Sequence, residues 1–343
     1  MIGPQVESKT SAGLSSRELG WNQPEKWMEA SPRWVGDEVD AGRRDVARDA
    51  ARAPVADEFA LAQLRAAPWW LWWNILSLDA PMVAIAWALV FAKSAGVALP
   101  GAEIASLGLV VWLIYTADRL LDGRPSARED AGAFGSPLQQ RHFFHRIHAR
   151  GIACVAAGVA VFTAILIPTQ IDAQVLKLAV PVGLILVLYM AWVHLGRGRV
   201  LARLPKEVAV GAIFAAGVAS PAWSRLGARR WEFFVLVALF AAVCALNCVA
   251  IEEWEPAPRG RRRAAATDFR SGRFAVGLAV CATLLAPVVR LRGEFSAIGA
   301  AIAVGALLIL FLDLMRERIS ADALRVLVDV ALLLPALVVL AIP

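Results

Sequence analysis

The chain has 343 residues, of which 59% are hydrophobic, and its mean hydropathy of +0.59 excludes an ordinary soluble globular protein. The formal net charge of +6 comes from Arg and Lys between apolar segments, without interleaved aromatic platforms, so it does not indicate a nucleic-acid partner. The four cysteines lie within apolar segments without paired metal spacing and imply no disulfide framework.

Residues 1–67 carry many charges with scattered Gly, Pro and Ser, and no apolar run there is long enough for a signal peptide. We expect a flexible cytosolic tail over 1–67 and one membrane domain over 68–343. Trp69, Trp70, Trp72 and Trp73 open that domain. Such clusters mark the headgroup level of a bilayer more often than they form an aromatic ligand box.

Windows of about 20 apolar residues, the length that crosses a bilayer as a helix, divide residues 68–343 into nine predicted spans. The apolar runs are long and continuous, which excludes the alternating strands of a membrane barrel. The sequence therefore predicts an all-α integral membrane protein, a bundle of nine transmembrane helices over residues 68–91, 102–121, 151–169, 176–195, 208–223, 231–251, 274–289, 295–315 and 323–342.

Arg and Lys are concentrated in alternate loops, those after the second, fourth and sixth predicted spans. Positive residues in short loops stay on the cytosolic side of a membrane. We therefore expect a cytosolic N-terminus and an exported C-terminus in the inner or plasma membrane.

Two carboxylates end the second predicted span in the segment Tyr115-Thr-Ala-Asp118-Arg-Leu-Leu-Asp122. A spacing of four residues places Asp118 and Asp122 on nearly the same helical face, where they repel each other unless a cation lies between them. Mg²⁺ suits such a pair, because it is commonly shared between one or two carboxylates and a substrate phosphate. Ion pairing with Arg119 and Arg124 is the structural alternative.

A second acidic cluster ends the sixth predicted span, where Asn247 is followed by Glu252, Glu253 and Glu255. Each acidic end precedes an Arg-rich cytosolic loop, as in an internal repeat of membrane helices. Two carboxylate clusters above basic loops predict a concave site for an anionic ligand, in which metal ions bridge the acids to phosphate. The expected ligand is a diphosphate.

From Trp69 to the C-terminus, these motifs resemble the UbiA superfamily of intramembrane prenyltransferases. That family has nine helices, with aspartate-rich motifs ending the second and the sixth. Its members bind an isoprenyl diphosphate through Mg²⁺ at these motifs and ionise it, and an aromatic or other lipid-soluble acceptor captures the allylic cation. The resemblance implies the same Mg²⁺-dependent prenyl transfer at the cytosolic face of the lipid bilayer.

On this resemblance, the expected catalytic acids are Asp118, Asp122 and Glu255, and the expected metal ligands are the same three residues with Glu252. The expected substrate-binding residues are Asn247, Tyr189, Lys206, Arg119 and Tyr115. Trp112, Tyr115 and Phe214 are candidates to stabilise the cation through their π faces.

The sequence also departs from the family pattern. Ile114 stands where the family has Asn, and Ile251 occupies the place of one acid of the second motif, beside Glu252. A terpene cyclase of the same fold and a non-catalytic lipid-binding or transport protein are therefore the alternatives. Arg325 and Asp329, four residues apart in the last predicted span, are expected to pair with each other.

The orientation is testable with reporter fusions. A reporter placed after Arg128 is expected in the cytosol and one at Pro343 on the exported side, because the basic loops fix the alternation of the spans. Two reporters on the same side would contradict the predicted topology.

Overall fold

The computed structural model describes residues 61–62, 64–122, 140–195, 206–227, 230–254 and 294–342, which all lie within one compact unit, Ala56–Pro343. Apart from turns and short connections, these residues are helical, with no strand among them. The helices are α2 Trp69–Ile75, α3 Asp79–Ser94, α4 Gly101–Asp122, α5 Gln140–Ile147, α6 Ala149–Gln170, α7 Ala173–Leu195, α8 Lys206–Ser224, α9 Arg230–Trp254, α11 Glu294–Met315 and α12 Ala321–Ala341.

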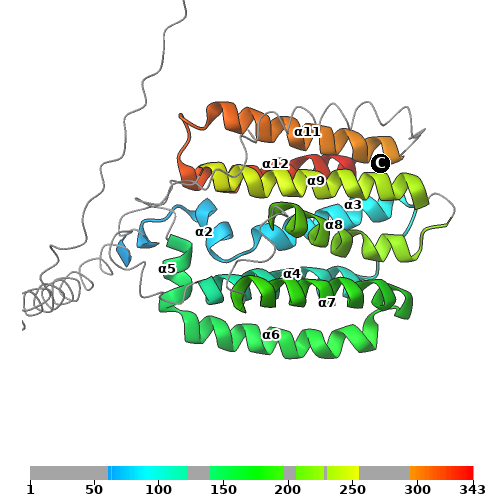
Figure 1. Ribbon diagram of the computed structural model, residues 1–343, viewed down its shortest axis with the longest axis horizontal. Coiled ribbons are helices and arrows are strands. Elements are labelled where there is room, and N and C mark those ends of the chain that lie inside the picture. The colour runs from blue at the N-terminus through cyan, green and yellow to red at the C-terminus, as the bar shows by residue number, and fades with distance from the viewer. Residues whose placement is uncertain are drawn as a thin grey trace, which may run out of the picture. The chain divides into compact units, whose positions relative to one another are not determined.

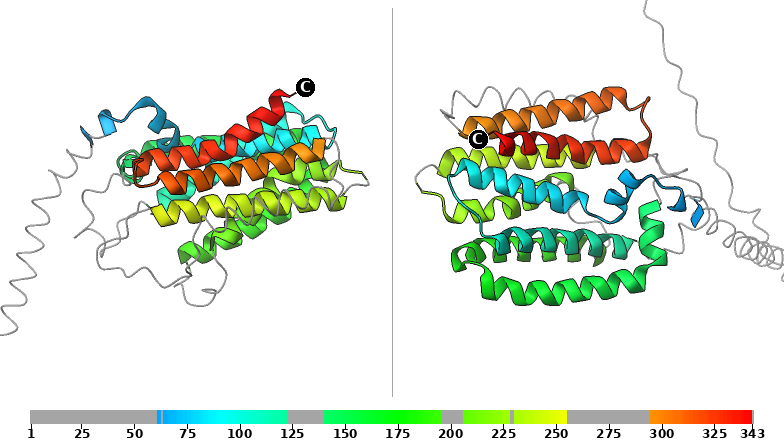
Figure 2. Two further views of the ribbon diagram at one scale, coloured as in Figure 1. Left: turned by 90° about the horizontal axis from the view of Figure 1, so that it is seen from above. Right: turned by 180° about the vertical axis from the view of Figure 1, so that it is seen from behind.

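Among the described helices, seven are long and apolar enough to cross a membrane, and the bent pair α2 and α3 passes the same test when counted as one span. The chain is thus an all-helical integral membrane protein, as the sequence predicts. The long helices lie side by side, with the short α2 and α5 at one end (Figures 1 and 2). The predicted span 274–289 and almost all of the predicted tail lie outside the described residues.

The first predicted span is not one straight helix. Between α2 and α3 the chain breaks at Leu76–Leu78, and the two helix axes differ in direction by 82°. Pro81 explains the position of the break, because a proline within a continuous helix would lack the N–H that bonds four residues back and would clash with that carbonyl. In the first turn of a new helix starting at Asp79, Pro81 is tolerated.

Helix α3 lies at the centre of the bundle and packs against α4, α8, α11 and α12. Its Trp87 is fully buried, stacks on Phe240 of α9 at 4.4 Å between ring centroids, and donates its indole N–H to the Leu332 carbonyl of α12 at 3.0 Å. A buried indole N–H needs such a partner where water is absent. One side chain therefore ties three helices together.

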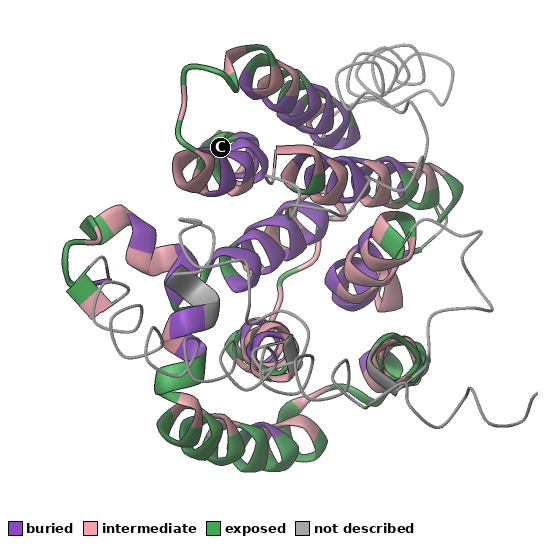
Figure 3. Ribbon diagram, turned by 60° about the vertical axis from the view of Figure 1, so that its left-hand side comes forward, coloured by how far each residue is buried: buried purple, intermediate pink, exposed green. Residues whose placement is uncertain are grey.

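Helices α6 and α7 are peripheral and expose most of their apolar side chains, including Val161, Phe162, Leu184 and Leu188 (Figure 3). α6 packs against α4 and α5, whereas α7 packs against α8. In a bilayer, lipid tails solvate such faces as well as protein does.

An ion pair joins α4 to the end of α8. The Arg225 guanidinium, just beyond α8, donates to both carboxylate oxygens of Glu103, at 2.9 and 2.5 Å. These hydrogen bonds raise the pKa of Arg225 above its ordinary value. The bidentate geometry fixes the first turn of α4 against the last turn of α8.

Helices α8 and α9 approach each other closely at Gly211. A Cβ atom there would lie 2.5 Å from the Ala241 carbonyl oxygen and 2.8 Å from the Ala245 nitrogen, both backbone atoms of α9. Small residues allow this close contact between membrane helices.

We predict that Gly211→Ala lowers the thermal stability of the protein in detergent by about 1–3 kcal/mol, because the added methyl group forces α8 away from α9. The matched control is Gly217→Ala on the same helix, where nothing lies within 4 Å of the added methyl group. Equal thermal stabilities of the two variants would contradict the close packing.

Candidate functional site

A cavity of about 410 Å³ lies where several helix ends meet. It is lined by the last turns of α4 and α9 and the first turns of α3, α8 and α12, with further residues from α2 and α7. Its polar lining residues are Asn74, Asp79, Tyr115, Asp118, Arg119, Tyr189, Lys206, Glu207, Asn247, Glu252, Arg325 and Asp329. Helices α3, α8 and α12 begin at this end of the bundle, whereas α4 and α9 end there. The cavity therefore lies at one face of the membrane bundle.

The cavity brings together most of the residues that the sequence singled out, namely Asp118, Tyr115, Arg119, Tyr189, Lys206, Asn247 and Glu252. Asp122 is the last residue of α4, but its side chain, like all of Glu255, lies outside the described part of the structure. Trp112 does not line the cavity, whereas Tyr115 and Phe214 do.

At the outer part of the cavity, Lys206 opens α8 and faces Glu252 near the end of α9. Its ammonium Nζ lies 3.1 Å from Glu252 Oε1 and 3.6 Å from Glu207 Oε1. The side chains of Lys206 and Glu252 are 63% and 58% exposed, so this pair forms a solvated rim. Such an ion pair adds little stability and is readily exchanged for a ligand's charges.

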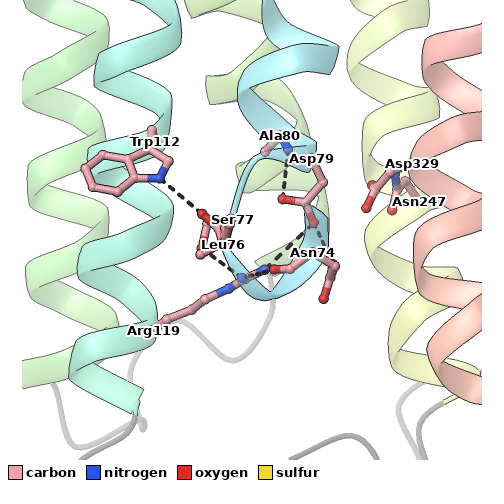
Figure 4. Close-up of polar contacts among 9 residues, drawn as sticks. All are labelled: Asn74, Leu76, Ser77, Asp79, Ala80, Trp112, Arg119, Asn247 and Asp329. Carbon is pink, nitrogen blue, oxygen red and sulfur yellow. Dashed lines mark hydrogen bonds and ion pairs between the residues drawn. The ribbon is translucent and has the colours of Figure 1, made fainter. Parts of the chain in front are cut away.

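Deeper in the cavity, Arg119 of α4 holds the break between α2 and α3. Its Nη1 donates to the Asn74 carbonyl and to Ser77 Oγ, the latter at 2.8 Å, and its Nη2 lies 3.8 Å from Asp79 Oδ2 (Figure 4). Trp112, two turns earlier, donates its indole N–H to the Leu76 carbonyl at 3.1 Å. α4 therefore supplies the donors that carbonyls at a broken helix lack.

Asp79 begins α3 inside this network. Its Oδ1 accepts the Ala80 N–H at 3.0 Å and its Oδ2 accepts the Asn74 amide at 2.6 Å. Asp329 of α12 lines the same cavity and accepts a hydrogen bond from the Asn247 amide of α9 at 3.0 Å. Figure 4 shows the side chains of Asp79 and Asp329 together with these partners. Asp329 is thus contacted from another helix, whereas its pairing with Arg325 stays a prediction.

The sequence reasoning did not place Asn74, Ser77, Asp79 or Asp329 in the site. Asp79 and Asp329 were visible as charges within apolar segments, which is the usual signal of a functional position. Their proximity depends on contacts between segments about 250 residues apart, which no spacing rule reveals.

The described candidate metal ligands, Asp118 and Glu252, are carboxylates, whose oxygens suit a hard cation such as Mg²⁺. No group of three His, Cys, Asp or Glu side chains that could hold a metal occurs among the residues described. One or two carboxylates are enough for Mg²⁺ when substrate phosphates complete its coordination. The described residues therefore fit a shared ion and not a closed protein cage.

Comparisons with known proteins give no further guide: no family model, no curated protein and no solved structure matches the chain.

We predict that Arg119→Ala destabilises the folded protein by about 3 kcal/mol or more, because it leaves buried Asp79 without its counter-charge and removes a donor from the Asn74 carbonyl and from Ser77 Oγ at the break. Thermal unfolding in detergent is the measurement. Arg119→Lys is expected to be intermediate, because one ammonium lacks the reach of a planar guanidinium.

The matched control is Arg230→Ala, at the exposed start of α9, which is expected to leave stability nearly unchanged. If Arg119→Ala unfolds at the same temperature as the control, the break does not depend on Arg119.

Proposed function

We propose that this protein is a membrane-embedded prenyltransferase of UbiA type, which moves a prenyl group from a polyprenyl diphosphate to a lipid-soluble acceptor at the cytosolic face. The observation that carries the proposal is the cavity at the helix ends, where Asp118, Lys206 and Glu252 converge from three helices. A charged rim, together with the apolar side chains of Val83, Phe214 and Leu332 in the lining, suits a ligand with a diphosphate head and an isoprenoid tail.

The proposal includes a bundle of nine transmembrane helices with a cytosolic N-terminus. α9 ends and α12 begins at the cavity, and α11 joins α12 through the short connection 316–320, so α9 and α11 run in the same direction. The parallel course of α9 and α11 favours the predicted span 274–289 between them, although that span lies outside the described residues.

Mg²⁺ would be held by Asp118 with Asp122 on one side and by Glu252 with Glu255 on the other, in each case together with the diphosphate. When bound, it supplies positive charge that stabilises the departing diphosphate. Lys206, already at the rim, would give up its pairing with Glu252 and contact the same oxygens.

The prenyl carbon–oxygen bond then breaks, and its electron pair leaves with the diphosphate. Tyr115 and Phe214 line the inner wall, where their π faces would stabilise the allylic cation. The acceptor forms the new bond to the prenyl carbon and loses a proton. The apolar side chains in the lining also limit the access of water, which would otherwise capture the cation.

We predict that Asp118→Asn lowers Mg²⁺-dependent release of diphosphate on the order of 10²-fold, because the substitution removes a charge at the leaving group. The measurement uses purified full-length protein in lipid nanodiscs with geranyl, farnesyl and geranylgeranyl diphosphate, followed by mass spectrometry of the lipids.

The matched control is Asp172→Asn, which lies in the exposed connection between α6 and α7, where Asp172 caps the Gln174 N–H. Asn caps a helix as well as Asp does, so activity is expected to be unchanged. Equal activity of Asp118→Asn and the wild type would exclude the mechanism. Binding of the diphosphates without release would favour a lipid-binding protein, and a cyclised product would favour a terpene cyclase.

A further inference from the structure

The cavity ends inside the bundle at a definite set of side chains. Each main helix around it lines the cavity from its end at the membrane face inward to one deepest residue, beyond which the helix is no longer part of the wall. These deepest residues are Val83 of α3, Tyr115 of α4, Phe214 of α8, Cys244 of α9 and Leu332 of α12. Phe214 has the largest apolar side chain among them.

A buried aromatic cluster lies behind Phe214. Its ring centroid is 6.2 Å from that of Phe240, which in turn stacks on Trp87 at 4.4 Å. Phe240 and Trp87 are fully buried and do not line the cavity. Trp87 is also held by its hydrogen bond to the Leu332 carbonyl. A close-packed interior of this kind yields little to an added group, so Phe214 rests on a firm support.

The rise of helix α8 gives the depth at which Phe214 lies. Lys206 at the rim is the first residue of α8, and Phe214 follows it at a distance along the axis of about 12 Å, at about 1.5 Å per residue. Three bonds of an extended chain span at most about 3.6 Å, so the four bonds along one isoprene unit span about 5 Å. With the diphosphate at Lys206, the space above Phe214 therefore holds about two isoprene units.

We propose that Phe214, supported by Phe240 and Trp87, is the floor of the cavity and limits the donor to a prenyl chain of about two isoprene units, the length of a geranyl group. This inference rests on the proposed transfer reaction and restricts its donor to the short end of the class. A third isoprene unit would meet the Phe214 ring and push the diphosphate away from Asp118 and Lys206 at the rim. Phe214 is thus a residue that determines specificity for chain length.

Phe214→Ala tests the floor, because it removes the first ring and leaves Phe240, 6.2 Å away between centroids, as the next obstacle. The space gained is enough for about one more isoprene unit. In the wild type, kcat/KM for geranyl diphosphate is expected to exceed that for farnesyl diphosphate on the order of 10-fold, and Phe214→Ala is expected to lower this ratio on the order of 10-fold. The ratio is the measure because loss of a π face that stabilises the cation slows both donors alike.

The matched control is Phe234→Ala, which removes an exposed phenylalanine of α9 that does not line the cavity, so its ratio is expected to equal that of the wild type. Phe214→Leu keeps an apolar side chain of intermediate size and is expected to give an intermediate ratio, which provides a milder variant if Phe214→Ala unfolds. A wild-type ratio in the folded Phe214 variants, or the same change of ratio in Phe234→Ala, would overturn the proposal.

Binding without turnover separates the floor from the proposed function. The probes are geranyl and farnesyl S-thiolodiphosphate, which ionise slowly, and the measurement is the rise in unfolding temperature that each gives in detergent. The wild type is expected to be stabilised more by the geranyl compound, and Phe214→Ala by both. A wild type that shows this selectivity but releases no diphosphate would overturn the proposed function and support the floor. Equal stabilisation of the wild type by both compounds, or none by either, would overturn the floor.

Discussion

The arrangement of the cavity depends on how the protein satisfies a broken helix inside an apolar bundle. Where α2 gives way to α3, the Leu76 carbonyl loses its helical partner and the Asn74 carbonyl accepts the Ser77 N–H in place of the N–H four residues on, and lipid tails offer no hydrogen-bond donors of their own. Arg119 and Trp112 of α4 supply the donors. Arg119 directly follows Asp118, so one turn of α4 both secures the break and places an acid on the cavity wall.

Hydropathy and helix periodicity were enough to predict the spans that the structure describes, because each is a long apolar run bounded by charges. The same reasoning treated residues 68–91 as one helix, since a window average does not register a change of direction. Pro81 was the visible signal of the break. The motif residues share a cavity because they end or begin helices at the same face. The presence of Asp79 and Asp329 in one cavity could not be predicted, because it depends on how α3 and α12 pack.

The two faces of the bundle are built differently. At one, Glu103 and Arg225 join α4 and α8 through a bidentate pair that is largely withdrawn from solvent. At the other, the comparable pair, Lys206 with Glu252, is mostly exposed and has a single short contact. A buried pair is costly to separate, whereas an exposed one exchanges readily. The Glu103–Arg225 pair is thus costly to separate, whereas the Lys206–Glu252 pair at the other face exchanges readily with solvent ions.

The turn of 82° between α2 and α3 also sets the depth of the site. α3 has 16 residues and is about 24 Å long, whereas the hydrocarbon core of a bilayer is about 30 Å thick. A helix this short cannot span the core unaided, so with its last residue at one headgroup level its first residue, Asp79, would lie below the other unless the bilayer thins around it. A lipid-soluble molecule could then contact charged groups while it remains within the membrane, without moving into the aqueous phase.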